Sequence, residues 1–185
     1  MKKIIILSLV LAMTGCTSFF LRRDKPYDQL PSRIDSNYDI NTGRKETTLK
    51  FPFTRLIFVD IYRTIIYLSR SGSDKKDDSS YKLVLFIESP YWGFFKTAVF
   101  VIDGERISLE ATKSVQEGFQ ETCKCRAGRA REWSYFNVDR KFMEKITSGN
   151  SIEVTFLGIG LHKKEEYKLD AESVGKLREF GKIVL

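Results

Sequence analysis

The sequence predicts an α+β fold: a β-rich antiparallel sandwich or curved sheet, with a short helix and a C-terminal helix packed on it. Three observations lead to this prediction. Much of the chain after residue 47 alternates apolar and polar residues with the period of two that strands require. The dipeptide Asp103-Gly104, a strong signal for a tight hairpin, joins two such runs. Two later stretches change to the helical period.

The strands are expected wherever β-branched and aromatic residues gather. Residues 47–69 are long enough for two strands, or for one strand with a bend near Asp60. Residues 81–88 are apolar on both faces, which predicts a central strand. A long surface loop is expected between residue 112 and the strand at 133–138. The other expected strands cover residues 95–102, 106–111, 151–156 and 165–169.

Two helices are expected, and each has an aspartate at its start. Asp139 and Asp170 can cap the backbone N–H groups of a first turn, and Gly149 can end the shorter helix. Both stretches carry apolar residues at helical spacing, which would face the sheet. These residues are Phe142, Met143 and Ile146 in the first helix and Val174, Leu177 and Phe180 in the last.

A single domain is expected behind an N-terminal leader, because domains usually run to roughly 100 to 200 residues and the chain has 185. Residues 1–15 are expected to be a signal peptide, residues 16–46 an anchor, tether and irregular lead-in, and residues 47–185 the β-rich domain. Hydrophobic residues make up 42% of the chain, which is enough to form a packed core.

The first 16 residues have the layout of a secretory leader, with Lys2 and Lys3 ahead of an apolar run at 4–13. The run has about ten residues, half of the roughly 20 that cross a bilayer as a helix. Residues 11–16, Leu-Ala-Met-Thr-Gly-Cys, resemble the lipobox of bacterial lipoproteins, with methionine where leucine is most common. That resemblance implies that Cys16 carries acyl chains. The alternative is a simple secretory leader with an incidental cysteine.

The resemblance also bears on location and partners. The membrane, reached through the N-terminal lipid, is the expected partner, together with another envelope protein or anionic lipid. Thr17 stands where lipoproteins retained at an inner membrane often have aspartate, which favours the outer membrane if the host has two. Nucleic acid is not an expected partner, because the protein would be exported.

Beyond the leader, the pattern from Trp92 through the Asp103-Gly104 turn, the short helix, the strand at Ile152 and the last helix is similar to small uncharacterised bacterial envelope proteins. That similarity carries no activity over to this chain.

No cofactor or metal is expected. His162 is the only histidine, and no serine lies in a G-x-S-x-G context, so the sequence gives no nucleophile paired with a base. Cys123 and Cys125 lack a second pair of ligands for zinc. Three states compete for these cysteines: a local disulfide, free thiols, or links to another chain. We favour the local disulfide.

Two further groups of side chains are candidates for binding or catalysis. A basic cluster around the cysteines is a candidate patch for phosphate groups of lipid or of an envelope polymer, or a solvated charged loop. It consists of Lys124, Arg126, Arg129 and Arg131. Glu88 and Asp103 flank an aromatic run at residues 91–95 and are a candidate acid pair for cleaving a glycan.

Two hypotheses of function follow. The leading one is a lipid-anchored envelope protein that serves as a non-catalytic binding or structural module. The alternative is an envelope hydrolase that acts on glycan or peptidoglycan with paired carboxylates. The second requires two acids about 5 to 10 Å apart, so Glu88 and Asp103 must converge if they are that pair.

Overall fold

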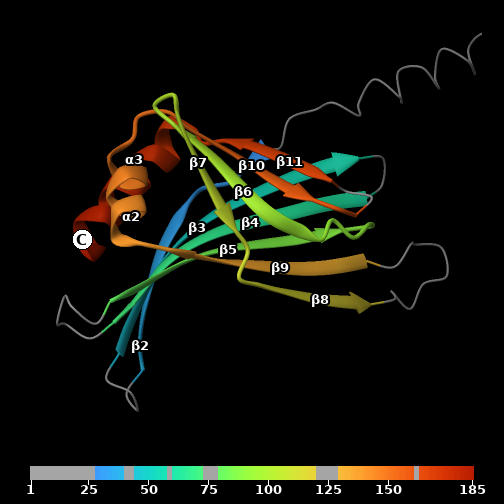
Figure 1. Cartoon of the computed structure of the whole chain (residues 1–185), viewed down its shortest axis with the longest axis horizontal. Helices are drawn as coiled ribbons and strands as arrows, with labels where there is room; N and C mark the ends of the chain where they lie inside the picture. The colour runs from blue at the N-terminus through green and yellow to red at the C-terminus, as the bar shows by residue number, and fades with distance from the viewer. Residues whose placement is uncertain (1–27, 40–43, 58–59, 73–78, 120–128, 161–162) are drawn as a thin grey trace, which may run out of the picture.

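The computed structural model describes residues 28–39, 44–57, 60–72, 79–119, 129–160 and 163–185. Within these residues, two antiparallel sheets pack face to face, and two helices lie together at one end (Figure 1). The predicted α+β class is confirmed. The helices are α2 (Arg140–Ser148) and α3 (Ala171–Val184). Neither helix is long and apolar enough to cross a membrane.

The larger sheet has the order β1-β3-β4-β5-β9-β8, with β2 paired to the same strand as β1. Its strands are β1 (Asp28–Gln29), β2 (Arg33–Asp39), β3 (Arg44–Ile57), β4 (Asp60–Gly72), β5 (Ser80–Ser89), β8 (Lys113–Phe119) and β9 (Arg129–Val138). The residues 47–69 therefore hold parts of two strands, β3 and β4. As predicted from its two apolar faces, β5 lies inside the sheet, between β4 and β9.

The smaller sheet has the order β11-β10-β6-β7. Its strands are β6 (Phe95–Ile102), β7 (Glu105–Glu110), β10 (Ile152–Gly158) and β11 (Lys164–Lys168). The predicted Asp103-Gly104 hairpin joins β6 to β7, with positive φ at both residues, as a tight turn requires. Here β7 is an end strand of its sheet.

The core lies between the two sheets and continues under the helices. Phe136 of β9 and Phe156 of β10 face each other with ring centroids 6.1 Å apart, and Phe100 of β6 meets Phe142 of α2 edge to face. Both aspartates cap their helices as predicted: Asp139 accepts from the N–H of Phe142, and Asp170 from that of Ser173. The predicted apolar faces of both helices are buried.

The structure corrects two expectations about irregular segments. Part of the expected lead-in forms strands, since β1, β2 and the start of β3 precede residue 47. Part of the expected loop after residue 112 forms β8. Both β2 and β8 run along the outside of the sheet, and their side chains are mostly exposed. Edge strands of this kind need little apolar patterning, so the sequence carries no strong signal for them.

The sandwich has two distinct ends. We call one the helix end: it carries α2, α3 and the Asp103-Gly104 turn. We call the other the loop end: it carries the segment Pro90–Phe94 between β5 and β6, and the turn between β10 and β11 (Figure 1). The length of the strands separates the two ends.

Candidate functional site

The proposed acid pair is not brought together. Glu88 lies near the end of β5 at the loop end, whereas Asp103 follows β6 at the helix end. The 8 residues of β6 separate these ends, which is about 26 Å at the usual rise of a strand. A glycosidase pair lies about 5 to 10 Å apart. This arrangement removes the geometric basis for catalysis by Glu88 and Asp103 together.

Glu88 is buried within an ionic cluster. Arg129 donates to its Oε1 at 2.6 Å, and Arg131 donates to its Oε2 at 3.3 Å. Burial raises the pKa of Glu88, but the hydrogen bonds and charges of Arg129 and Arg131 outweigh it, so the pKa is lowered overall. The carboxylate is therefore ionised and engaged by arginine, which suits a structural role rather than proton transfer.

Asp103 connects its turn to the start of β10. Its carboxylate accepts from the backbone N–H groups of Asn150 and Ser151, at 3.0 and 2.8 Å. The same two N–H groups, that of Ser151 first, lower the pKa of Asp103. Both oxygens serve this backbone contact.

Several predicted site residues lie outside the described part of the chain: Cys16, Cys123, Lys124, Cys125, Arg126 and His162. Of the basic patch, Arg129 and Arg131 are described, and both contact Glu88. Within the described residues, no group of three or more His, Cys, Asp or Glu side chains could hold a metal ion.

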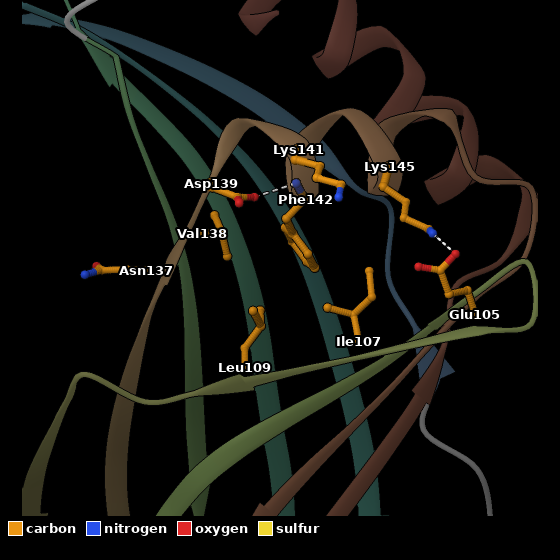
Figure 2. A pocket seen from close by; sticks show the side chains of 9 residues that line it. All are labelled: Glu105, Ile107, Leu109, Asn137, Val138, Asp139, Lys141, Phe142 and Lys145. Atoms are coloured by element: carbon orange, nitrogen blue, oxygen red, sulfur yellow. Dashed lines mark hydrogen bonds and ion pairs between the residues drawn. The ribbon is translucent and has the colours of Figure 1, made fainter.

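A groove of about 550 Å³ opens at the helix end, between β7, the end of β9 and the start of α2 (Figure 2). Ile107, Leu109, Val138 and Phe142 form its apolar part, and charged side chains of both signs surround it. The lining charged and polar residues are Glu105, Asn137, Asp139, Lys141 and Lys145. Lys145 forms an ion pair with Glu105 across one side of the groove.

The backbone of β7 borders this groove. The N–H of Ala111 donates to the carbonyl of Lys96, toward β6, while the N–H of Thr112 donates to Tyr135 on the other side. Because successive residues of a strand point their backbone groups to alternate sides, Ser108 presents its N–H and C=O to the side away from β6. Ser108 is exposed. Within the described residues, no strand pairs with β7 along that edge.

A second hollow, of about 480 Å³, lies at the loop end. Its lining is largely apolar and comes from two segments, Pro90–Phe94 and the turn that follows β10. Three of its large hydrophobic residues are exposed to solvent: Ile159 is 67% exposed, Tyr91 54% and Phe94 38%. The rings of Trp92 and Phe94 stack with centroids 5.9 Å apart. Lys163 contributes a cation to the lining.

One buried carboxylate shapes the segment Pro90–Phe94. Glu132 of β9, which is 3% exposed, accepts from three successive backbone N–H groups, those of Gly93, Phe94 and Phe95. Phe94 has a φ of 51°, a backbone conformation that residues other than glycine seldom adopt. The fold therefore holds a strained backbone that keeps an aromatic ring partly in solvent.

The turn after β10 braces the same segment. The N–H of Gly160 donates to the carbonyl of Gly93 at 2.8 Å. A side chain at Gly158 would collide with the backbone of Gly93, and one at Gly160 would collide with that of Trp92. The two glycines therefore allow the two segments to lie backbone against backbone.

Neither hollow is evident from sequence reasoning. The groove combines residues from β7, β9 and α2 that are up to 40 positions apart, between Glu105 and Lys145. In the sequence, Glu88 and Asp103 flank the aromatic run at residues 91–95, and nothing there indicates its contact with Ile159. The available signal for Glu132 is its spacing of four residues from Phe136, which puts it in phase with the inward positions of β9, because a buried carboxylate needs hydrogen-bond donors.

The comparisons with known proteins add no relative: no protein-family model, curated protein or solved structure matches this chain.

Proposed function

We propose that the protein is a lipid-anchored, non-catalytic component of the cell envelope that binds an extended segment of another envelope protein along β7. The observation that carries the proposal is that β7, whose outer edge pairs with no described strand, lies beside a groove that is apolar inside and charged at its rim. The anchor rests on the lipobox-like residues 11–16.

Strand addition explains why these features occur together. An extended segment gains main-chain hydrogen bonds along a free sheet edge, and its alternate side chains enter neighbouring pockets. Beside β7, the side chains of Ile107 and Leu109 would contact such an apolar residue. The groove offers about 550 Å³, room for more than one large side chain.

The rim indicates the composition of the segment. Lys141 and Lys145 carry positive charge, and Glu105 and Asp139 carry negative charge, so the rim has no strong excess of either sign. A segment with apolar residues between charges of both signs fits this rim better than a purely anionic ligand does. A protein partner is therefore favoured over an anionic polymer at this site.

A pair of substitutions at Ser108 tests the strand addition. Proline at this position removes the outward N–H without removing a donor to β6, whereas alanine keeps the N–H. A photocrosslinking residue at exposed Lys141 would report the partner in intact cells. We expect a discrete crosslinked adduct when residue 108 is serine and when it is alanine, and we expect the Ser108→Pro variant to lose that adduct. An adduct of equal yield in Ser108→Pro, with the fold intact by circular dichroism, would overturn the strand addition.

The anchor has its own test. Cells grown with an alkyne-labelled palmitate should label the protein, and the Cys16→Ser variant should lose both the label and sedimentation with membranes. Cys16 is the residue to which the lipobox resemblance assigns the lipid. An unlabelled parent protein in the soluble fraction would contradict lipid anchoring while leaving the groove proposal intact.

A further inference from the structure

We infer that the loop end of the domain docks onto the surface of the lipid bilayer, through the exposed side chains of Tyr91, Phe94 and Ile159. This inference rests on the proposed lipid anchor. It adds that the folded domain has a fixed orientation on the membrane, with its groove directed away.

The exposed side chains have the composition of a membrane interface. Tyrosine and tryptophan favour the headgroup region, where the ring is apolar and the polar atom stays hydrated. Tyr91 and Trp92 supply such rings at the loop end, and Phe94 and Ile159 supply wholly apolar surface. Lys163 places a cation beside them, as an anionic headgroup layer favours.

The segment is held in place rather than collapsed onto the core. Glu132 fixes three consecutive N–H groups and stabilises the positive φ of Phe94. Gly158 and Gly160 allow the turn with Ile159 to pack against the same backbone. Two separate segments are thus locked together with their apolar side chains outward, as a preformed contact surface requires.

The place where the described chain begins and the length of chain before it favour the membrane as the occupant. Asp28, where the described chain begins, pairs with Thr54 of β3, which pairs with Arg63 of β4, which pairs with Glu88 of β5. Asp28 thus lies in the same cross-strand row as Glu88, three strand spacings or about 14 Å away. The segment Pro90–Phe94 begins two residues after Glu88.

Asp28 therefore lies between the two ends of the domain: its neighbour Gln29 contacts Ser173 at the start of α3, and Glu88 near the loop end is about 14 Å away, within reach of the tether. Residues 17–27 reach at most about 40 Å from Cys16, even when fully extended. A tether of this length keeps the loop end near the bilayer at an effective concentration of about millimolar. A contact too weak to recruit a free protein is then sufficient to orient an anchored one.

The two tryptophans of the chain provide a matched measurement. Trp92 lines the hollow at the loop end. Trp133 lies within β9, four residues after the strand begins at Arg129, and its ring packs against that of Phe86. The full-length acylated protein is placed in phosphatidylethanolamine and phosphatidylglycerol vesicles with brominated acyl chains, which quench tryptophan on contact. In the Trp133→Phe variant the fluorescence comes from Trp92 alone, and in the Trp92→Phe variant it comes from Trp133 alone.

We expect brominated lipid to quench Trp92 about twofold or more strongly than Trp133. Ile159→Asp should reduce the quenching of Trp92 to the level of Trp133. Ile183→Asp, which changes an isoleucine that is 47% exposed on α3 at the helix end, should leave it unchanged. Equal quenching of both tryptophans, or no effect of Ile159→Asp in a folded protein, would overturn the docking.

The intact mass of the same preparation separates this inference from the proposed function. An acylated, vesicle-bound protein with unquenched Trp92 overturns the docking alone. A protein that carries no acyl chain and does not sediment with vesicles overturns the anchor, and the docking with it.

Discussion

The carboxylate of Glu132 on β9 accepts a hydrogen bond at 3.0 Å from the backbone N–H of Phe94, which lies in the segment between β5 and β6, 38 residues earlier in the chain. The neighbouring N–H groups of Gly93 and Phe95 are bound to the same side chain. One buried side chain thus accepts from three backbone donors and holds Phe94 at a φ of 51°. The exposed aromatic surface depends on this contact.

Glu132→Gln should lower the free energy of unfolding by about 1 to 3 kcal/mol. The amide has nearly the shape of the carboxylate, but its NH₂ group would face backbone donors and leave one of them unpaired. Urea denaturation followed by tryptophan fluorescence measures the change. Glu46→Gln, at an exposed position on β3, is the control and should be neutral. Equal stabilities of the two variants would contradict the role assigned to Glu132.

Phe94→Asn and Phe94→Ala should differ in stability although both remove the ring. Asparagine tolerates positive φ, whereas alanine retains strain of about 1 kcal/mol. We therefore expect the asparagine variant to be more stable than the alanine variant by about that amount, measured by thermal unfolding. Both should lose contact with brominated lipid. An alanine variant as stable as the asparagine variant would show that the positive φ at this position is not a source of strain.

Stability should fall in acid partly through Glu88. Its pKa in the folded protein is below the ordinary value of 4.5, so its ionised form is favoured by folding. The contribution is complete above pH 4.5 and is lost as the pH falls through the folded pKa. Glu88→Gln should be less stable at pH 7 and should show a shallower loss between pH 5 and pH 3, measured by urea denaturation across this range. Parallel profiles for the two proteins would contradict this assignment.

Two glycines of α3 should respond oppositely to alanine. A side chain at Gly181 would meet the buried Thr147 of α2 at 2.7 Å, so Gly181→Ala must push the helices apart. We expect a loss of about 1 to 3 kcal/mol. Gly175 has open space around it, and alanine there should stabilise the helix by about 0.5 to 1 kcal/mol. Thermal unfolding of both variants checks the signs, and a stabilised Gly181→Ala would contradict the close packing of the helices.

Local patterns were sufficient for much of the fold. Apolar residues on both faces of the segment 81–88 predicted a central strand, and capping by Asp139 and Asp170 predicted both helix starts. These signals lie within a few residues of one another, so a single sequence contains them in full. The exposed edge strands β2 and β8 have no such local signal, because pairing with a neighbouring strand rather than burial makes them strands.

The candidate surfaces required distant residues to be combined. Glu88 and Asp103 flank one aromatic run in the sequence, yet β6 carries them to opposite ends of the sandwich. Ile159 is far from Tyr91 in sequence, yet both line one hollow. Register between strands decides such neighbours, and register depends on the packing of the whole core.

By itself, the sequence determined the antiparallel α+β class, the order of most strands along the chain, the starts of both helices and the end of the shorter one, because periodicity, capping and turn chemistry act over short distances. Only the tertiary structure decided that Glu88 is held by Arg129 and Arg131, that Glu132 fixes the segment before β6, and that an open edge of β7 borders a groove. Each of these depends on which strands become neighbours when the two sheets close over a shared core.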